Sequence, residues 1–104
     1  MKMVAVTACP TGIAHTYMAA TRLGNAARVL QHDIKIETQG AMGVENALSN
    51  KDITLADVVI IAADIPIRDE KRFAASRVVK TTTHEAIADP HGVLSRALAL
   101  LATN

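Results

Sequence analysis

The residues with the clearest chemical potential lie in one short segment. Residues 7–16 read Thr-Ala-Cys-Pro-Thr-Gly-Ile-Ala-His-Thr, and Cys9 is the single cysteine of the chain. An apolar run precedes this segment and a helical pattern follows it, which predicts a thiol at the N-terminal end of a helix. A thiol in that position has a pKa below its free value of about 8.5, so Cys9 is a candidate nucleophile.

The same segment has the features of an anion-binding loop. Free backbone N–H groups and the positive dipole end of a helix attract an anion of phosphoryl size. Gly12 lets the backbone approach such a group closely, and Thr11 and Thr16 add hydroxyl donors. His15 either donates to a bound phosphate or is a solvated helix residue at the surface. We therefore expect a nucleophile and a phosphate cradle in one loop.

Three other interpretations of this loop are open from the sequence. Cys9 could be a small buried hydrophobe, as many free cysteines are. Cysteine phosphatases have Cys, five residues, then Arg and Ser or Thr, whereas here the spacing gives His15 and Thr16, so the phosphate clamp is missing. A flavin phosphate site is a weak third choice, because such sites flank the flavin with aromatic rings and this chain has only Tyr17 and Phe73.

Charged residues elsewhere give weaker signals. Asp64 follows an apolar segment and could either act on a proton near Cys9 or cap its own loop as an Asx turn. The mixed-charge run from Arg68 to Arg72 is interpreted as a solvated surface, with partner docking as the alternative. No metal site is predicted, because ligand spacing is lacking among His32, His84 and His91.

Four apolar segments rich in Val or Ile are predicted strands that could hold this loop in place. They are Lys2–Thr7, Ile34–Thr38, Asp57–Ala63 and Arg77–Thr81. The first and third are continuously apolar, as central strands are, whereas the second alternates and the fourth is short, as at sheet edges. Right-handed crossovers then give a single-domain α/β fold, a Rossmann-like three-layer sandwich with a doubly wound parallel sheet of order 2-1-3-4 and helices on both faces. Ligands bind such sheets beyond the carboxyl ends of the strands where the winding reverses, which here means the loops after the first and third strands.

Two long helices and several short ones are predicted to cover this sheet. The first runs from about Ala14 to Leu30, and the members of its buried stripe are Ala19, Leu23, Ala26, Ala27 and Leu30. Val44–Leu48 could form a helical turn, and Ser49 starts a capping box for a second short helix. Thr83 is the expected cap of another short turn. The last helix begins at Asp89-Pro90, and its apolar face is Val93, Leu94, Ala97, Leu98 and Leu101.

The composition limits the classes of function that fit. The chain has 104 residues, room for one domain over 1–104, and no linker or repeat divides it. A net charge of +1 and two aromatic residues argue against a nucleic-acid partner. A single cysteine excludes an internal disulfide and a cysteine-based zinc site, which suits a reducing cytoplasm. The apolar start is too short for a membrane span or a signal peptide, so we expect a cytoplasmic protein without direct membrane insertion.

The loop and its surroundings resemble a known family. The sequence Ala5-Val6-Thr7-Ala8-Cys9-Pro10-Thr11-Gly12-Ile13-Ala14-His15-Thr16 is similar to the signature of the fructose-type enzyme IIB of the bacterial phosphoenolpyruvate-dependent sugar phosphotransferase system. The resemblance extends, in the family's order and spacing, to Glu37-Thr38-Gln39-Gly40, Gly43, residues 56–65 and Arg72-Phe73-Ala74. It therefore covers nearly the whole chain.

The resemblance implies a phosphoryl relay through a phosphocysteine at Cys9. Members of this family accept a phosphoryl group from a phosphohistidine of the IIA protein or domain, hold it on the loop cysteine, and pass it to a sugar carried through the membrane by IIC. The sugar would be fructose or a fructose-like sugar, and no metal or organic cofactor would be required. The implied phosphate cradle consists of Pro10, Thr11, Gly12, Ile13, Ala14, His15 and Thr16.

Two features of the sequence differ from the common family pattern. Family members commonly have Gly-Lys-Pro where this chain has Ala75-Ser76-Arg77, and an acidic residue is frequent near the position of Thr21. These differences concern docking to IIA or IIC and leave the loop untouched. A regulatory or binding module that keeps the fold and the anion site without transferring phosphoryl groups is the competing class, and a cysteine phosphatase is the less favoured one.

Overall fold

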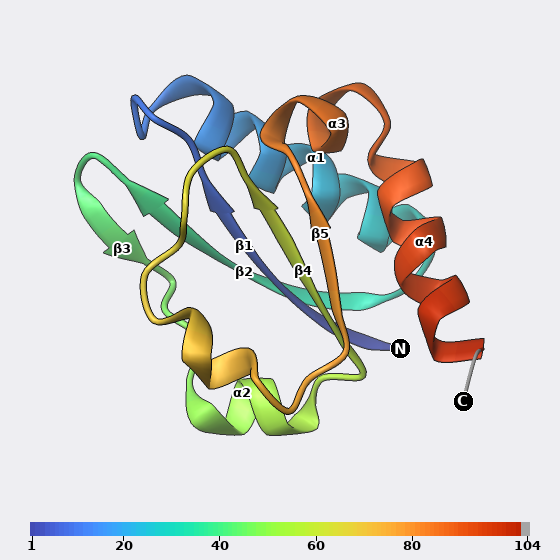
Figure 1. Cartoon of the computed structure of the whole chain (residues 1–104). Helices are drawn as coiled ribbons and strands as arrows, with labels where there is room; N and C mark the ends of the chain where they lie inside the picture. The colour runs from blue at the N-terminus through green and yellow to red at the C-terminus, as the bar shows by residue number, and fades with distance from the viewer. Residues whose placement is uncertain (103–104) are drawn as a thin grey trace.

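A computed structural model of the chain, which describes residues 1–102, has a five-stranded sheet covered by helices (Figure 1). The strands are β1 (Lys2–Ala8), β2 (Asp33–Gly40), β3 (Gly43–Glu45), β4 (Val58–Ala63) and β5 (Val78–Thr81). The α-helices are α1 (Ala14–Val29), α2 (Asn50–Leu55), α3 (Thr83–Ala88) and α4 (Pro90–Ala102), and one 3-10 helix, η1, spans Glu70–Phe73. In this described part of the chain, none of the helices has the length and apolar character of a membrane span.

The sheet confirms the expected α/β fold and adds one strand. Its order is β3-β2-β1-β4-β5, and the four predicted strands pair in parallel in the expected order. The expected edge position of the second strand is wrong, because β3 pairs antiparallel with β2 and occupies that edge. The helical turn expected at Val44–Leu48 is wrong for the same reason, since Val44 pairs with Gln39 in this short ladder.

Alternating side chains of the central strands belong to two apolar clusters, one on each face of the sheet. Met3 and Ala5 of β1 face a cluster formed with α1, α3 and α4. Val4, Val6 and Ala8 face the other cluster, which includes residues from α2, η1 and the segment after β4. Covering on both faces explains the continuous apolar runs of β1 and β4, and it fixes the ends of both strands in space.

The helix boundaries follow local signals with two exceptions. Ser49 and Asp52 form the expected capping box of α2, and the Asp89 carboxylate accepts a hydrogen bond from the Gly92 amide at the start of α4. Leu30 was expected in the buried stripe of α1, but the helix ends at Val29 and Leu30 is exposed. The N-cap of α3 is Thr82, which accepts from the Glu85 amide, rather than the expected Thr83.

Three loops meet at the carboxyl ends of the strands. The loop after β1 lies beside the turn between β2 and β3 (Figure 1), where the Ala41 amide donates to the Gly12 carbonyl at 2.9 Å. The segment after β4 joins them, since the Asp64 amide donates to the Ala8 carbonyl at 3.0 Å. This is the edge of the sheet at which the sequence predicts a ligand site.

Candidate functional site

The loop after β1 is a tight turn that places the start of α1 next to Cys9. The Gly12 amide donates to the Cys9 carbonyl at 3.0 Å, and Gly12 has a φ of +67°, a conformation that other residues adopt only at a cost. A Cβ at Gly12 would lie 2.4 Å from the Ala41 backbone nitrogen. Glycine is therefore needed both for the turn and for the contact between the loops.

The sulfur of Cys9 is surrounded by hydroxyl groups. Thr16 donates from Oγ1 to Cys9 Sγ at 3.0 Å, and Thr11 Oγ1 lies 3.5 Å from the same atom. Thr16 is fully buried, and the Thr7 hydroxyl donates to its backbone carbonyl at 2.9 Å, which holds the first turn of α1 against β1. Two of the predicted cradle residues therefore contact the thiol directly.

These contacts favour the thiolate form of Cys9. Burial of the side chain raises the pKa, but the hydrogen bonds from Thr16 and Thr11, with backbone donation from Gly12 and Thr16, outweigh burial and lower it from 9.0 to about 6. At pH 7 the sulfur is then predominantly ionised. A thiolate is the nucleophilic form of cysteine, so this side chain is prepared to attack an electrophilic centre.

Cys9 is only 2% exposed, but it borders a pocket of about 250 Å³ at the surface. The loop after β1, the β2–β3 turn and the segment after β4 form its walls, and the lining residues are Ala8, Cys9, Pro10, Thr11, Gly12, Gln39, Gly40, Ala41, Ile65, Pro66 and Arg68. A larger hollow of about 480 Å³ lies over α1 and β2 and does not include Cys9. Because nucleophilic chemistry requires the thiol, we assign the site to the smaller pocket.

The remaining predicted loop residues are divided between the pocket and the surface. Pro10 lines the pocket together with Cys9. Ile13, Ala14 and His15 are exposed at the start of α1 and are absent from the pocket lining. The structure therefore places Thr11, Gly12 and Thr16 around the sulfur, and it places the His15 imidazole in solvent.

Asp64 is held by a structural contact. Both of its carboxylate oxygens accept hydrogen bonds from Thr83, at 3.0 Å from the amide and 2.5 Å from the hydroxyl. This pairing ties the end of β4 to the start of α3 and gives both carboxylate oxygens a hydrogen-bond partner. The contact is not the expected Asx turn within its own loop, because the partner lies 19 positions along the chain, and it engages both oxygens that could otherwise accept a proton near Cys9.

The mixed-charge run from Arg68 to Arg72 is exposed from Arg68 to Lys71, as its composition suggests, and Arg72 is its one partly buried member. The Arg72 side chain is 14% exposed and forms a bidentate ion pair with Glu37, whose side chain is 1% exposed. Arg68 lines the pocket beside Cys9. The charge pattern alone gives no signal for either role, because Glu37 and Cys9 lie far earlier in the chain and only the fold brings them close.

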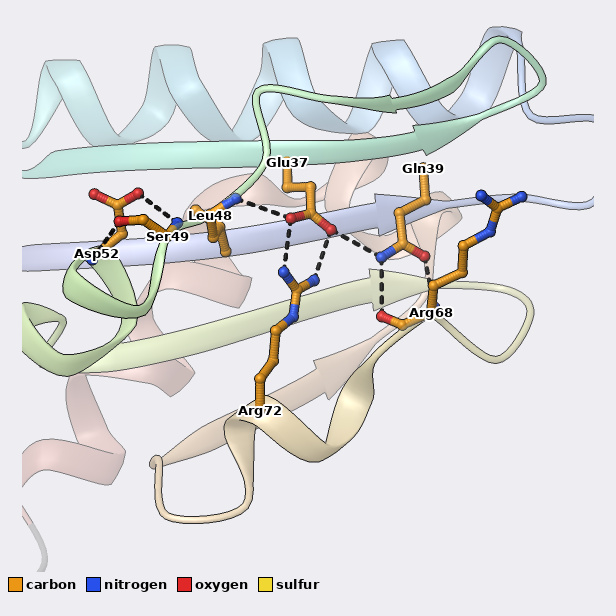
Figure 2. A network of polar contacts seen from close by, with 7 residues as sticks. All are labelled: Glu37, Gln39, Leu48, Ser49, Asp52, Arg68 and Arg72. Atoms are coloured by element: carbon orange, nitrogen blue, oxygen red, sulfur yellow. Dashed lines mark hydrogen bonds and ion pairs between the residues drawn. The ribbon is translucent and has the colours of Figure 1, made fainter.

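Glu37 is the centre of a buried polar network (Figure 2). Its carboxylate accepts from Arg72, from the Leu48 amide at 2.9 Å and from Gln39 Nε2 at 2.8 Å. Burial raises the pKa of Glu37, but the hydrogen bonds, led by that from Arg72, prevail and lower it below its usual value. The carboxylate is therefore ionised and fully satisfied, which gives one wall of the pocket a rigid support.

Within residues 1–102, no group of three His, Cys, Asp or Glu side chains is arranged to hold a metal ion. The residues around Cys9 Sγ are hydroxyl and amide donors, which suit an anion rather than a cation. The arrangement can therefore combine nucleophilic attack by sulfur with stabilisation of a negatively charged group by the surrounding donors.

Comparison with known proteins gives consistent matches over nearly the whole chain. A family model described as "PTS system, Lactose/Cellobiose specific IIB subunit" matches residues 4–96. The chain is 45% identical to the PTS system fructose-like EIIB component 2 of Escherichia coli K12, over 97% of this chain and 95% of that protein. It is 48% identical to part of the PTS system fructose-specific EIIB'BC component of Xanthomonas campestris, over 94% of this chain but only 17% of the longer protein. A crystal structure of a predicted fructose specific IIB from Escherichia coli superimposes with a TM-score of 0.94 at 40% identity, covering 98% of this chain and 90% of that one.

Proposed function

This chain belongs to the IIB subunit family of the sugar phosphotransferase system, and we propose that it carries the transferred phosphoryl group on Sγ of Cys9. Membership of the family implies phosphoryl transfer in sugar uptake as the general activity. The observation that carries the assignment to Cys9 is its sulfur, held as a thiolate by the Thr16 and Thr11 hydroxyls at the edge of a pocket.

In the first step, Cys9 accepts the phosphoryl group from a phosphohistidine of a IIA protein. The thiolate attacks phosphorus, an S–P bond forms, and the N–P bond to the histidine breaks, leaving the electron pair on the ring nitrogen. The lowered pKa supports this step, because the sulfur needs no base to remove a proton at neutral pH. The hydrogen-bond donors around the sulfur then face the negative charge of the bound phosphoryl group.

In the second step, a hydroxyl oxygen of the sugar attacks the same phosphorus. An O–P bond forms, the S–P bond breaks, the thiolate of Cys9 is restored, and the hydroxyl proton is released to a base or water outside this chain. The sugar is presented by a membrane IIC protein, so this step takes place at the cytoplasmic face of the membrane. The Xanthomonas campestris relative, named as an EIIB'BC component, supports this partnership.

The pocket favours relay over hydrolysis. Within the described part of the chain, no carboxylate lines the pocket, and Asp64, the nearest acidic residue after β4, is engaged by Thr83. A water molecule beside a phosphocysteine would therefore have no base to activate it. A fructose or fructose-like sugar is the proposed acceptor, since two relatives are named for fructose-like and fructose-specific systems.

Reconstitution with labelled phosphoenolpyruvate, the general phosphotransferase proteins and a matching IIA tests the proposal. We expect stoichiometric label on the wild type and none on Cys9→Ser, with Thr54→Ser as a control that makes a comparable small change at an exposed site. Equal labelling of wild type and Cys9→Ser would refute the assignment. Turnover of an aryl phosphate without partners would point to a phosphatase, and phosphate binding without labelling would point to a binding module.

A further inference from the structure

Arg68 is a charged residue that lines the pocket bordering Cys9. Apart from the Cys9 thiolate, it is the only charged side chain among the residues that line this pocket. Arg68 is exposed, and its guanidinium forms no ion pair with any residue that the structure describes. Arg68 therefore combines a place in the pocket lining with a cation that no carboxylate neutralises.

The backbone of Arg68 is fixed by Gln39. The Arg68 amide donates to Gln39 Oε1 at 2.8 Å, and Gln39 Nε2 donates to the Arg68 carbonyl at 3.2 Å. The side-chain amide of Gln39 thus binds both backbone polar groups of Arg68, which lies 29 positions later in the sequence. The loop is held in place whatever side chain residue 68 carries, because the clamp uses only its backbone.

Gln39 is itself oriented by the buried ion pair. Its Nε2 also donates to Glu37 Oε2, and a carboxylate can only accept, so the amide cannot turn over without losing this bond. Arg72 also fixes the Glu37 carboxylate, with two hydrogen bonds of 2.8 and 2.6 Å. Figure 2 shows the resulting order of contacts from Arg72 through Glu37 and Gln39 to Arg68, with the Arg68 guanidinium beyond Gln39 and away from Arg72.

We propose that Arg68 is a phosphoryl-binding residue, whose guanidinium contacts the phosphoryl group bound next to Cys9. This inference rests on the proposed function and assigns a group that the loop after β1 does not contain, since His15 occupies the position at which cysteine phosphatases carry their arginine. Gln39 acts as a positioning residue, because it fixes the loop from which the guanidinium extends. A planar guanidinium can donate two parallel hydrogen bonds to phosphate oxygens and offset their charge.

Binding of inorganic phosphate tests this role without any transfer reaction. We would use the Cys9→Ser chain, because it lacks the thiolate that repels a phosphate dianion, and follow the Gly12 and Thr16 amides by NMR during titration. Arg68→Gln in this background should weaken phosphate binding about tenfold, the effect of losing a charge-assisted hydrogen bond of about 1.4 kcal/mol. Lys71→Gln is the matched control, since it removes the same charge from a nearby exposed side chain outside the pocket.

The outcomes separate this inference from the proposed function. A weaker phosphate affinity for Arg68→Gln, with Lys71→Gln unchanged, supports the phosphoryl-binding role. Equal affinities for the two variants, or no phosphate binding by the Cys9→Ser chain, overturn it. Labelling of Cys9 by IIA in the wild-type chain is a separate result. The relay can therefore hold while the role of Arg68 fails, and phosphate binding by Arg68 can be detected even if Cys9 is not labelled.

A double-mutant cycle tests the positioning role of Gln39. Gln39→Met keeps the length of the side chain but removes the clamp on the Arg68 backbone. We expect it to weaken phosphate binding in the presence of Arg68 and to have little further effect once Arg68→Gln is present. Additive losses would show that Gln39 acts independently of Arg68 and would contradict the positioning role.

Discussion

Replacing Thr16 by valine should raise the pKa of the Cys9 thiol and reduce its reactivity at low pH. The Thr16 hydroxyl donates to Sγ at 3.0 Å, and among the hydrogen bonds that lower this pKa it has the largest effect. Valine keeps the shape of threonine in this fully buried position but has no hydrogen to donate. The side chain of Thr11 and two backbone amides still favour the thiolate, so the change is partial.

The expected shift is about one pKa unit. A hydrogen bond to a charged group contributes roughly 1.5–3 kcal/mol, and one pKa unit corresponds to about 1.4 kcal/mol, so we take the lower end because other donors remain. The pKa would then move from about 6 to roughly 7. At pH 5.5 the thiolate fraction would fall about eightfold, whereas at pH 8 it would hardly change.

The assay is the rate of alkylation by iodoacetamide between pH 4 and 10. Cys9 is the only cysteine, so the signal has a single source. Thr11→Val is the matched control and should give a smaller shift, because its oxygen lies 3.5 Å from the sulfur. The same midpoint for wild type and Thr16→Val, or a wild-type midpoint near 8.5, would refute the argument that these hydroxyls hold the thiolate.

Three other predictions concern stability and the pocket. Because folding lowers the pKa of Cys9, its contribution to stability is complete above the unfolded value near 9 and is lost as the pH falls through about 6. In chemical denaturation, the free energy of unfolding of the wild type should therefore rise by up to about 4 kcal/mol relative to that of Cys9→Ser between pH 6 and 9. A difference between the two proteins that does not change with pH would contradict this prediction. Gly12→Ala should cost about 1–3 kcal/mol in unfolding free energy and move the alkylation midpoint of Cys9 upward, and an unchanged midpoint would argue against the contact with the β2–β3 turn. Arg72→Met should destabilise the chain by about 3–5 kcal/mol because Glu37 is left buried and unpaired. Lys80→Met, which breaks an exposed pair, should cost under about 1 kcal/mol, and equal losses would disprove the difference in burial.

Most of the fold could be predicted from local sequence patterns. The continuous apolar run of β4 and the alternation in β2 are visible over a few residues, and right-handed crossovers then set the order of the parallel strands. The capping box at Ser49 and the start of α4 at Pro90 are equally local. Such features depend on neighbours within one or two turns of chain, so a single sequence contains them.

Short elements escaped prediction because their stability comes from distant contacts. The three residues of β3 have no strong pattern of their own and become a strand by pairing with β2. Thr82 and Thr83 are equally good caps on their own. Asp64 decides between them, since it binds the Thr83 hydroxyl and amide and leaves Thr82 to cap α3.

The site residues also fall into two groups, those that are close in sequence and those that only the fold brings together. The loop around Cys9 and its hydroxyl donors were predicted, because they lie within ten residues and share one strand-to-helix turn. Gln39 and Arg68 were missed as site residues, since only the fold brings them to the same pocket. Glu37 lies on the polar side of an alternating strand, a pattern that indicates exposure, but η1 covers that side and provides Arg72 to pair with it.

Localising the phosphoryl group in the phosphorylated protein tests the central claim most directly. After reaction with phosphorylated IIA and rapid digestion under mild conditions, fragmentation of the peptide spanning residues 3–22 would distinguish Cys9 from His15 and from the hydroxyl side chains on that peptide. We predict that the added mass is on Cys9 and is absent from Cys9→Ser. A phosphoryl group on His15, or on a peptide from another part of the chain, would contradict the account.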